Sequence, residues 1–376
     1  MIDFRSDTVT KPSKAMLDAM FSAPVGDDVF GEDPTINELQ EYTADLFGME
    51  AALYCSSGTQ TNQIAINVHT SPGGEVITHV ESHVYKYEGG GIARNSGVCV
   101  RLLDGNRGRI SVDQILPWMN NPDDVHFPLT QLISLEDTAN RGGGAIYDFN
   151  EIKKIRAFCI DQGLPLHLDG ARIMNAMVEN GVDLKDYGSQ FDSISLCLSK
   201  GLGAPVGSLL IGKKDFIKKA HRVRKVFGGG MRQAGIIAAG GLYALKNNVE
   251  RLKEDHANAK ALEGAFNEMD WVDHVLGVET NIVVVVLKNG ELRDQIIAKF
   301  NQKGMTPMQA LLAPHLTDRA IVMIGALPAN PAAFLTGFSL RRSESCKTGR
   351  RSNSQRGDAG QAKQSVHGSL PFGNAM

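Results

Sequence analysis

The sequence predicts an α/β fold in which a mostly parallel sheet lies between layers of helices. From Ala51 onward, short apolar runs alternate with glycine-rich turns and with stretches of helical periodicity. This alternation indicates parallel βαβ units, whose sheet is covered on both faces. Two of the runs, Leu164–Leu168 and Ile194–Leu198, are followed by Asp169 and by Lys200. Ligands bind at the carboxyl ends of the strands in such sheets, so we expect the functional site at this edge.

Composition argues against several classes of protein. The 376 residues carry a net charge of -3, whereas a nucleic-acid-binding protein normally has a basic excess. The five cysteines form no CxxC pair and no spaced set with histidines, which argues against a disulfide framework or a structural metal site. The longest apolar run, Ile282–Leu287, is too short to span a bilayer, and the N-terminus lacks the apolar core of a signal peptide. We therefore expect a soluble, cytoplasmic protein without nucleic-acid or membrane partners.

Residues 1–47 are expected to form an N-terminal segment that packs on two domains. Phe4–Pro12 looks extended, and Lys14–Phe21 has the apolar spacing of a helix. Thr35, with Glu38 three residues later, has the form of a capping box and predicts a second helix that ends at Gly48.

Residues 48–246 are expected to form the large domain. The predicted strands are Ala51–Ser56, Glu75–Thr78, Val98–Leu102, Gln131–Leu135, Leu164–Leu168, Ile194–Leu198 and Ser208–Ile211, the last of which could turn back on its predecessor. The predicted helices are Gln63–His69, His83–Arg94, Asp113–Met119, Asn150–Gln162, Lys213–Phe227 and Ala234–Leu245.

Residues 247–338 are expected to form a smaller α+β domain. It begins with the charged helix Asn247–Met269 and continues with the strand Asn281–Leu287 and the helix Leu292–Lys303. From Ser339 to Met376 the composition changes to Ser, Arg, Gly and Gln with almost no apolar residues, which predicts a disordered tail.

Asp169 and Lys200 together indicate chemistry at a carbonyl group. A lysine amine can form a Schiff base with a substrate carbonyl or with pyridoxal phosphate. A carboxylate keeps the ring nitrogen of that cofactor protonated. Either residue alone is more often ordinary, as a surface lysine or a helix N-cap. Their positions at the ends of two strands of one sheet favour a function.

Two further groups of residues could bind an anion. The turn SSGTQ, which contains Ser57, Gly58 and Thr59, lies between a predicted strand and a helix. Backbone N–H groups at a helix N-terminus favour a phosphate there, although simple helix capping explains these residues equally well. Lys225 and Arg232 flank a run of three glycines and could contact a phosphate or a carboxylate. A solvated basic helix face is the alternative.

Three histidines and one arginine complete the set of candidates. His83 follows a predicted strand, and its imidazole could stack on a flat cofactor ring or be an incidental polar residue. His126 and His167 are similar candidates, and the case for His167 is weaker because it alternates with the apolar residues of its strand. Arg172 could bind a carboxylate with two hydrogen bonds, or it could pair with Asp169.

Several of these segments occur together in one known family. The segments are RSDTVTKP (Arg5–Pro12), GDDVFGEDPT (Gly26–Thr35), CSSGTQTNQ, HLDGARIMNA, Leu196–Ser208 and GGGMRQAG. In combination they resemble the low-specificity L-threonine aldolases of the β-eliminating lyase group, and the resemblance continues from Ile2 to about Lys303. It implies the fold-type I architecture of enzymes that use pyridoxal 5'-phosphate. It also implies a homotetramer, a dimer of dimers whose active sites are shared between subunits.

The resemblance implies a role for each candidate residue. Lys200 would hold the cofactor as a Schiff base, Asp169 would pair with its ring nitrogen, and His83 would stack on the ring and help to remove the hydroxyl proton of the substrate. Gly58 and Thr59 would form the cup that binds the cofactor phosphate. Arg172 would lie near the phenolic oxygen of the cofactor and bind the substrate carboxylate, which Ser6 would also contact. His126 would lie near the substrate hydroxyl, and Lys225 and Arg232 would reach the site of a neighbouring subunit.

The implied reaction is the retro-aldol cleavage of a β-hydroxy-α-amino acid, L-threonine or L-allo-threonine, to glycine and acetaldehyde. Such a lyase would serve threonine catabolism and glycine formation. The sequence leaves open which diastereomer is preferred, and whether the base is His83 or a water molecule that it positions. β-Elimination or transamination on the same fold is the alternative reaction.

The sequence departs from the family pattern in two places. Asp137 and Ala139 stand where the family has Asn and His, a change that could alter substrate preference. The family's closing strand, with an arginine that binds the substrate carboxylate, is not found, and Arg319 in the sequence HLTDR is its only trace. A C-terminally altered homologue that binds the cofactor but turns over poorly is therefore a second hypothesis.

Overall fold

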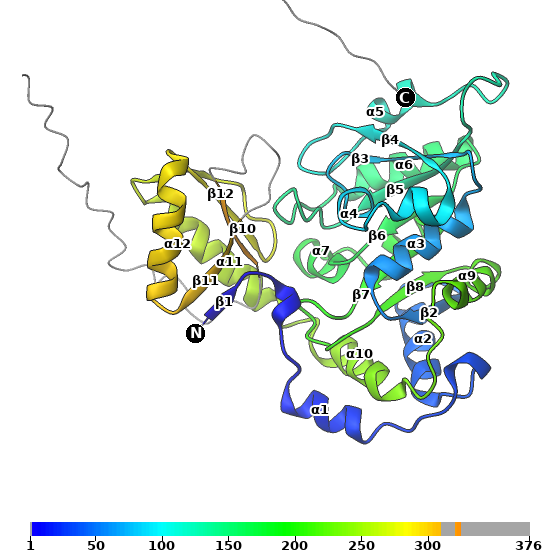
Figure 1. Cartoon of the computed structure of the whole chain (residues 1–376), viewed down its shortest axis with the longest axis horizontal. Coiled ribbons are helices and arrows are strands. Elements are labelled where there is room, and N and C mark those ends of the chain that lie inside the picture. Colours follow the sequence, from blue (N-terminus) through cyan, green and yellow to red (C-terminus); the bar gives the residue numbers. More distant parts are fainter. Residues whose placement is uncertain (1, 310–319, 325–376) are drawn as a thin grey trace, which may run out of the picture. The chain divides into compact units, whose positions relative to one another are not determined.

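Two β-sheets organise the described part of the chain, which comprises residues 2–309 and 320–324 of a computed structural model (Figure 1). The larger sheet has seven strands in the order β2-β8-β7-β6-β5-β3-β4. They are β2 (Ala51–Cys55), β3 (Glu75–His79), β4 (Cys99–Leu103), β5 (Thr130–Glu136), β6 (Leu166–Asp169), β7 (Ser193–Cys197) and β8 (Ser208–Gly212). The smaller sheet has five strands in the order β1-β11-β12-β10-β9. They are β1 (Ile2–Phe4), β9 (Val272–Val275), β10 (Ile282–Leu287), β11 (Met305–Gln309) and β12 (Ala320–Ile324).

The larger sheet is mostly parallel, as predicted. Strands β4, β3, β5, β6 and β7 run in one direction. Strand β8 is antiparallel to both of its neighbours, β7 and β2, so the predicted reversal of this strand on its predecessor is confirmed. The carboxyl ends of β3, β5, β6 and β7 consequently lie along one edge of the sheet.

Helices cover both faces of this sheet, which also confirms the prediction. In β8, Leu210 packs with Leu53 in a cluster that includes residues of α3 and α9. Its neighbours Leu209 and Ile211 belong instead to the main core, with residues of α2, α6, α7 and α10. Alternate residues of a strand point to opposite faces, so the two clusters lie on opposite sides of the sheet. The helices are α2 (Pro34–Leu46), α3 (Gly58–His69), α6 (Phe149–Asp161), α7 (Ile173–Asn180), α9 (Lys214–Val226) and α10 (Gly235–Asn247).

The smaller sheet combines the N-terminal strand with later parts of the chain. β1 pairs with β11 in parallel, and β10 lies antiparallel between β9 and β12. Helix α11 (Leu252–Asn267) contacts β9 and β10, α12 (Arg293–Gln302) contacts β11, and α1 (Lys14–Phe21) lies beside α10. The domain boundaries at residues 47, 246 and 338 stay a prediction, and the predicted tail, residues 339–376, lies outside the described residues.

The predicted capping box at Thr35 is wrong. Asp33 is the N-cap of α2, because its carboxylate accepts hydrogen bonds from the backbone N–H groups of Thr35 and Ile36. Pro34 takes the first helical position, where its missing N–H is not needed. The Thr35 hydroxyl donates instead to the carbonyl oxygen of Pro24, at 2.7 Å.

The predicted helix His83–Arg94 is shorter than expected. Helix α4 (His83–Lys86) ends before Gly89 and Gly90, whose φ angles of 63° and 72° are left-handed, and a π-helical turn, Ile92–Ser96, follows. Glycine adopts this conformation without steric cost, so the pair ends the helix. Two other short helices are α5 (Val112–Ile115) and α8 (Leu184–Gly188). None of the helices in the described part is long and apolar enough to cross a lipid bilayer.

Candidate active site

Ionisable residues gather at the carboxyl edge of the larger sheet. Strand β6 ends at Asp169, which pairs with Glu136 at the end of β5. Strand β7 runs parallel to β6 and ends at Cys197, three residues before Lys200. The structure therefore places Asp169 and Lys200 at the same edge, at the ends of adjacent strands.

Asp169 is a buried carboxylate held by two neighbouring elements. Asp169 is only 2% exposed. One oxygen, Oδ2, accepts a hydrogen bond of 2.9 Å from Asn62 Nδ2 on α3, and Oδ1 accepts one of 3.2 Å from the backbone N–H of Ala171. Two carboxylate oxygens have about four acceptor positions, so Asp169 can accept further hydrogen bonds from a ligand.

The N-terminus of α3 packs against the carboxyl end of β7. Ser57 is its N-cap, with the hydroxyl accepting from the backbone N–H of Gln60 at 3.2 Å. A Cβ atom added to Gly58 would lie 2.5 Å from Cys197 Sγ, so only glycine fits at this point. The first N–H groups of a helix have no partner within the helix and form a ready anion site. The segment of Ser57, Gly58 and Thr59 therefore places such a site beside the strand that leads to Lys200.

Lys200 is half-buried, and its side chain makes no hydrogen bond or ion pair with the side chains that the structure describes. Lys200 and Arg172 line the same small cavity, together with Cys197. The charge of Lys200 also acts on Asp7, where it helps to lower the pKa of the carboxyl.

Arg172 pairs with Asp7 rather than with Asp169. Its Nε and Nη2 atoms donate to the two oxygens of Asp7, each at 2.7 Å, and both residues are buried. Nη1 donates to Asn140 Oδ1 at 3.3 Å. Burial alone would raise the pKa of Asp7, but the charge and hydrogen bonds of Arg172 outweigh it and lower this pKa. Ser6 lies next to Asp7 in the chain, and its hydroxyl accepts from Thr8 Oγ1 at 2.8 Å.

His83 begins α4 and is held by two glutamates. Its backbone N–H donates to Glu136 Oε2 at 2.7 Å, and its ring Nδ1 lies 3.0 Å from Glu88 Oε1. The ring centroid is 5.6 Å from that of Tyr87. Burial lowers the pKa of His83, but the hydrogen bond with Glu88 and the charges of Asp169, Glu88 and Glu136 outweigh burial, so the pKa is raised overall. Conversely, burial and the charge of Asp169 raise the pKa of Glu136.

Comparison with known proteins identifies the family of this fold and site. The model of the β-eliminating lyase family matches residues 3–289. The chain belongs to this family. The low specificity L-threonine aldolase of Escherichia coli K12 is 48% identical over 286 residues, which cover 76% of this chain and 84% of that protein. The probable low-specificity L-threonine aldolase 2 of Arabidopsis thaliana is 44% identical over 327 residues, which cover 86% and 91%.

A solved structure confirms the predicted fold class for this β-eliminating lyase. The threonine aldolase of Leishmania major superposes with a TM-score of 0.74 at 21% identity, over 89% of this chain and 96% of that one. At this identity the similarity concerns the fold, which is the fold-type I architecture predicted from the sequence.

Two of the predicted histidines do not join Asp169 and Lys200 in this chain. His126 is exposed in the loop before β5, where its Nδ1 lies 2.8 Å from Asp124 Oδ1. His126 precedes the amino end of β5, whereas Asp169 lies at the carboxyl end of β6. Because these two strands are parallel, the two residues lie at opposite edges of the sheet. His167 is buried within β6, with Nδ1 2.8 Å from Ser193 Oγ and Nε2 bonded to Asn62 on α3.

Lys225 and Arg232 also lie outside the cluster of Asp169 and Lys200. Arg232 is exposed, donates to Asp27 Oδ2 at 2.8 Å and stacks over the ring of Phe30 at 5.9 Å. Lys225, at the end of α9, lines a surface cavity with Arg222.

The departures from the family pattern lie beside the site. Asp137 is fully buried, and its Oδ2 accepts a hydrogen bond of 2.6 Å from the hydroxyl of Tyr187 on α8. Burial raises the pKa of Asp137 to about 7. Ala139 is covered by Gly108, where an added Cβ would lie 2.5 Å from the alanine methyl. Arg319, the trace of the closing strand, lies outside the described residues.

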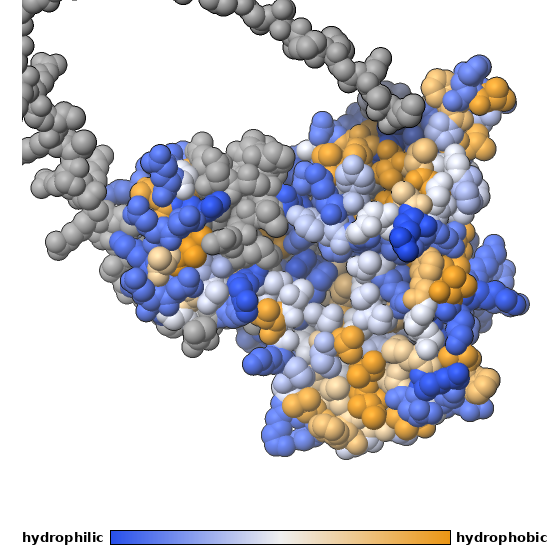
Figure 2. Space-filling model, in the orientation of Figure 1, coloured by the Kyte–Doolittle hydropathy of each residue, from blue (hydrophilic) through white to orange (hydrophobic). Residues whose placement is uncertain are grey.

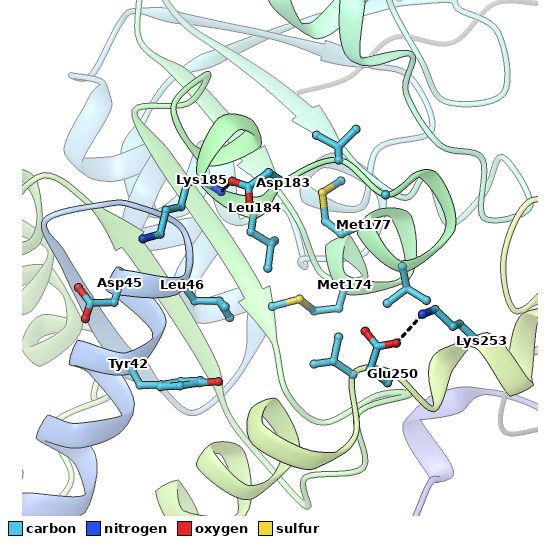
Figure 3. Close-up of a pocket in the computed structure, with 14 residues that line it drawn as sticks. Tyr42, Asp45, Leu46, Met174, Met177, Asp183, Leu184, Lys185, Glu250 and Lys253 are labelled. Carbon is cyan, nitrogen blue, oxygen red and sulfur yellow. Dashed lines mark hydrogen bonds and ion pairs between the residues drawn. The ribbon is translucent and has the colours of Figure 1, made fainter.

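A cavity of about 740 Å³ is lined by residues of α2 and α7 (Figure 3). Figure 3 shows Met174 of α7 pointing toward Leu46 of α2, with Lys253 and Glu250 in contact at one side. Neither Asp169 nor Lys200 lines it.

Sequence reasoning missed four residues that surround the candidates: Asp7, Asn62, Glu88 and Glu136. Asp7 lies within the quoted RSDTVTKP segment, and Asn62 lies within CSSGTQTNQ. Glu136 could have been found, because it ends a predicted strand just as Asp169 does. Glu88 follows His83 by five residues and lies beyond the end of α4, so its contact with the imidazole is apparent only in the folded chain.

Proposed function

We propose that this protein is a pyridoxal 5'-phosphate-dependent lyase that cleaves L-threonine or L-allo-threonine to glycine and acetaldehyde. The name of that activity is carried by relatives that are 48% and 44% identical to the chain. The observation that carries the proposal is the placement of Asp169 and Lys200 at the ends of adjacent parallel strands, with the N-terminus of α3 against Cys197. One ligand could therefore contact an amine, a carboxylate and an anion site at this edge.

The residues at this edge fit pyridoxal 5'-phosphate. Lys200 has a free amine for the aldehyde carbon, and Asp169 has acceptor positions left for a protonated ring nitrogen. Ser57, Gly58 and Thr59 would hold the phosphate at the N-terminus of α3. When bound, the cofactor withdraws electrons from the bond that breaks at the substrate Cα.

The remaining residues would bind and orient the substrate. Arg172 and Ser6 would hold its carboxylate, and the salt bridge to Asp7 keeps the guanidinium group of Arg172 in one orientation. His83 would accept the β-hydroxyl proton, either directly or through a water molecule that it holds. The raised pKa of His83 supports this role, because a stronger base accepts a proton more readily.

The proposal includes a homotetramer with shared sites. His126, Lys225 and Arg232 lie away from the site of their own chain, so their proposed roles require a second copy. Figure 2 shows apolar surface over α1 and α10, where Phe21 and Ile236 are exposed. Light scattering on the purified full chain tests the proposal, and a monomer that binds the cofactor normally would contradict the shared site.

We also propose a reducing, cytoplasmic location. The four cysteines in the described part of the chain, Cys55, Cys99, Cys159 and Cys197, are all free thiols. Titration of the unreduced, denatured protein with a thiol reagent should count all five cysteines of the sequence. A lower count would indicate a disulfide involving Cys346 and contradict this part of the proposal.

The deciding experiment is an assay of products. The full chain, loaded with pyridoxal 5'-phosphate, is given L-threonine and L-allo-threonine separately, and acetaldehyde and glycine are measured. Equimolar release of both products supports the proposal. Release of ammonia and a 2-oxo acid would indicate β-elimination instead. Cofactor binding without any product would favour the hypothesis of a catalytically weak homologue.

A further inference from the structure

Glu88 is a buried carboxylate whose hydrogen-bond partners are two side-chain amides and the imidazole of His83. Its side chain is fully buried, and no lysine or arginine in the described part forms an ion pair with it. Oε1 accepts from Asn62 Nδ2 at 2.9 Å and lies 3.0 Å from His83 Nδ1, and Oε2 accepts from Gln63 Nε2 at 2.6 Å. Burying a carboxylate is expensive unless its hydrogen bonds are satisfied, so a specific role for it is expected.

The neighbours of Glu88 determine the direction of these hydrogen bonds. Asn62 Nδ2 lies 2.9 Å from Glu88 and 2.9 Å from Asp169 Oδ2, so both of its N–H groups face carboxylates. The opposite orientation of the amide would turn its oxygen toward two negative charges. Gln63 Oε1 accepts from Asn95 Nδ2 at 3.2 Å, which leaves Gln63 Nε2 as the donor to Glu88.

His167 holds the Asn62 amide in this orientation. Its Nε2 lies 3.1 Å from Asn62 Oδ1, and its Nδ1 lies 2.8 Å from Ser193 Oγ. Burial lowers the pKa of His167 to about 3, so the ring is neutral near neutral pH and carries one proton. That proton must be on Nε2, because Asn62 Oδ1 can only accept. His167 therefore has a structural role in this network rather than a contact with the substrate.

These contacts assign a role to Glu88 that rests on the proposed function. We propose that Glu88 is a positioning residue that holds the proton of His83 on Nδ1 and so leaves Nε2 to take the β-hydroxyl proton of the substrate. An ionised carboxylate is only an acceptor, so the ring nitrogen that faces it must carry hydrogen. Asn62 joins this pair to Asp169, so one amide holds the carboxylates for both the imidazole and the cofactor ring.

The proton transfer balances without another reagent. In the cleavage, the O–H bond of the substrate breaks as the Nε2–H bond of His83 forms, and the hydroxyl oxygen becomes the carbonyl oxygen of acetaldehyde. The Cα–Cβ bond breaks, its electron pair stays with Cα, and a proton added to Cα gives glycine. His83 takes up one proton and Cα gains one proton, so the reaction needs no net proton from outside.

The charged groups around His83 determine what the loss of Glu88 should do. Glu88 acts from the same segment, Asp169 from the end of β6 and Glu136 from the end of β5. All three raise the pKa of His83, and Glu88 is the one that bonds to the ring. Removing its charge should therefore lower this pKa, so that His83 becomes neutral at lower pH.

The test is Glu88→Gln, assayed for acetaldehyde release across pH with the cofactor-loaded protein. We expect kcat to fall by roughly 100-fold, at the lower end of the 10²- to 10⁴-fold that general acid–base catalysis contributes. The acidic limb of the kcat/KM profile should move to lower pH, whereas damage limited to folding would reduce the active fraction without moving it. An unmoved limb would overturn the proposal.

A spectroscopic measurement tests the tautomer directly. In protein labelled with ¹⁵N-histidine, the neutral His83 ring should carry its proton on Nδ1, and a His83→Asn variant assigns the signals. A neutral His83 with the proton on Nε2 in the unmodified protein would refute the proposal, even if Glu88→Gln failed to fold. This readout requires no turnover, so it also separates the role of Glu88 from the proposed function, which fails if no glycine is formed.

Two variants serve as controls. Glu81→Gln removes a carboxylate from the same loop, but Glu81 contacts Lys86 and Arg141 instead of the imidazole. It should leave the His83 tautomer and the acidic limb unchanged, and an equal shift in this variant would contradict the specific role of Glu88. Glu88→Asp keeps the charge and should hold the acidic limb closer to that of the unmodified protein than Glu88→Gln does.

Discussion

Arg172 and Asp7 form a buried ion pair between residues that are 165 positions apart in the chain. Both hydrogen bonds measure 2.7 Å, and Asn281 Nδ2, one residue before strand β10, also donates to Asp7, at 3.3 Å. The N-terminal segment therefore holds the arginine that we propose for substrate binding, and it connects this arginine to the smaller sheet.

Asp7→Asn should destabilise the protein and weaken substrate binding. Removing one partner of a buried ion pair leaves an uncompensated charge, at a cost of about 3–5 kcal/mol. We expect a lower midpoint in thermal unfolding and a higher KM for L-allo-threonine. Asp18→Asn is the matched control, because it removes an exposed carboxylate that pairs with Lys14 on α1. Equal midpoints for the two variants would contradict a structural role for the buried pair.

The same ion pair should contribute to acid sensitivity. The pKa of Asp7 is lowered in the folded state, so its stabilising contribution is present above the unfolded value of 3.8 and is lost as pH falls through the lower folded value. Acid unfolding of the unmodified protein should therefore include a component below pH 3.8, and Asp7→Asn should lack it. Denaturant unfolding at several pH values measures this difference.

Lys200→Ala should abolish the covalent link to the cofactor. Reduction with borohydride in the presence of pyridoxal 5'-phosphate should label the peptide that contains Lys200 in the unmodified protein and leave this variant unlabelled by mass spectrometry. Lys185→Ala, beside the separate cavity of Figure 3, should be labelled normally. If the Lys200→Ala variant were labelled with cofactor at the same stoichiometry, the assignment of Lys200 as the Schiff-base lysine would be wrong.

Gly58→Ala should disturb the proposed phosphate site. Its methyl group would meet Cys197 Sγ at 2.5 Å, and overpacking of this kind costs about 1–3 kcal/mol. We expect weaker cofactor binding and a lower unfolding midpoint, with partial recovery in the double variant with Cys197→Ala. Gly264→Ala on α11 meets open space and should not destabilise the fold. No recovery in the double variant would contradict the contact with Cys197.

Asp137→Asn should stabilise the protein more at pH 8 than at pH 5. The pKa of Asp137 is raised from 3.8 to about 7 by burial, so its contribution to stability is lost as pH rises through this window. The asparagine can still accept the hydrogen bond from the Tyr187 hydroxyl but has no charge to bury. Unfolding midpoints at both pH values measure the effect, and an equal change at pH 5 and pH 8 would argue against a buried, titrating Asp137.

Local sequence predicted most elements of the larger sheet, because parallel strands buried on both faces appear as apolar runs between glycine-rich turns. It failed where neighbouring residues compete for one role. Asp33 and Thr35 could both cap α2, and Asp33 does so because Pro34 then fits the first helical turn. The helix expected from His83 ends early, because Gly89 and Gly90 take left-handed conformations.

The sequence by itself determined the family, the parallel sheet, and the positions of Asp169 and Lys200 at one edge of it. These features depend on short-range periodicity and on local motifs. Only the tertiary structure decided the partners: Asp7 for Arg172, Glu88 for His83, and Asn62 between Glu88 and Asp169. Hydrogen bonds depend on distance in space, and folding brings together side chains whose separation in the chain carries no sign of the contact.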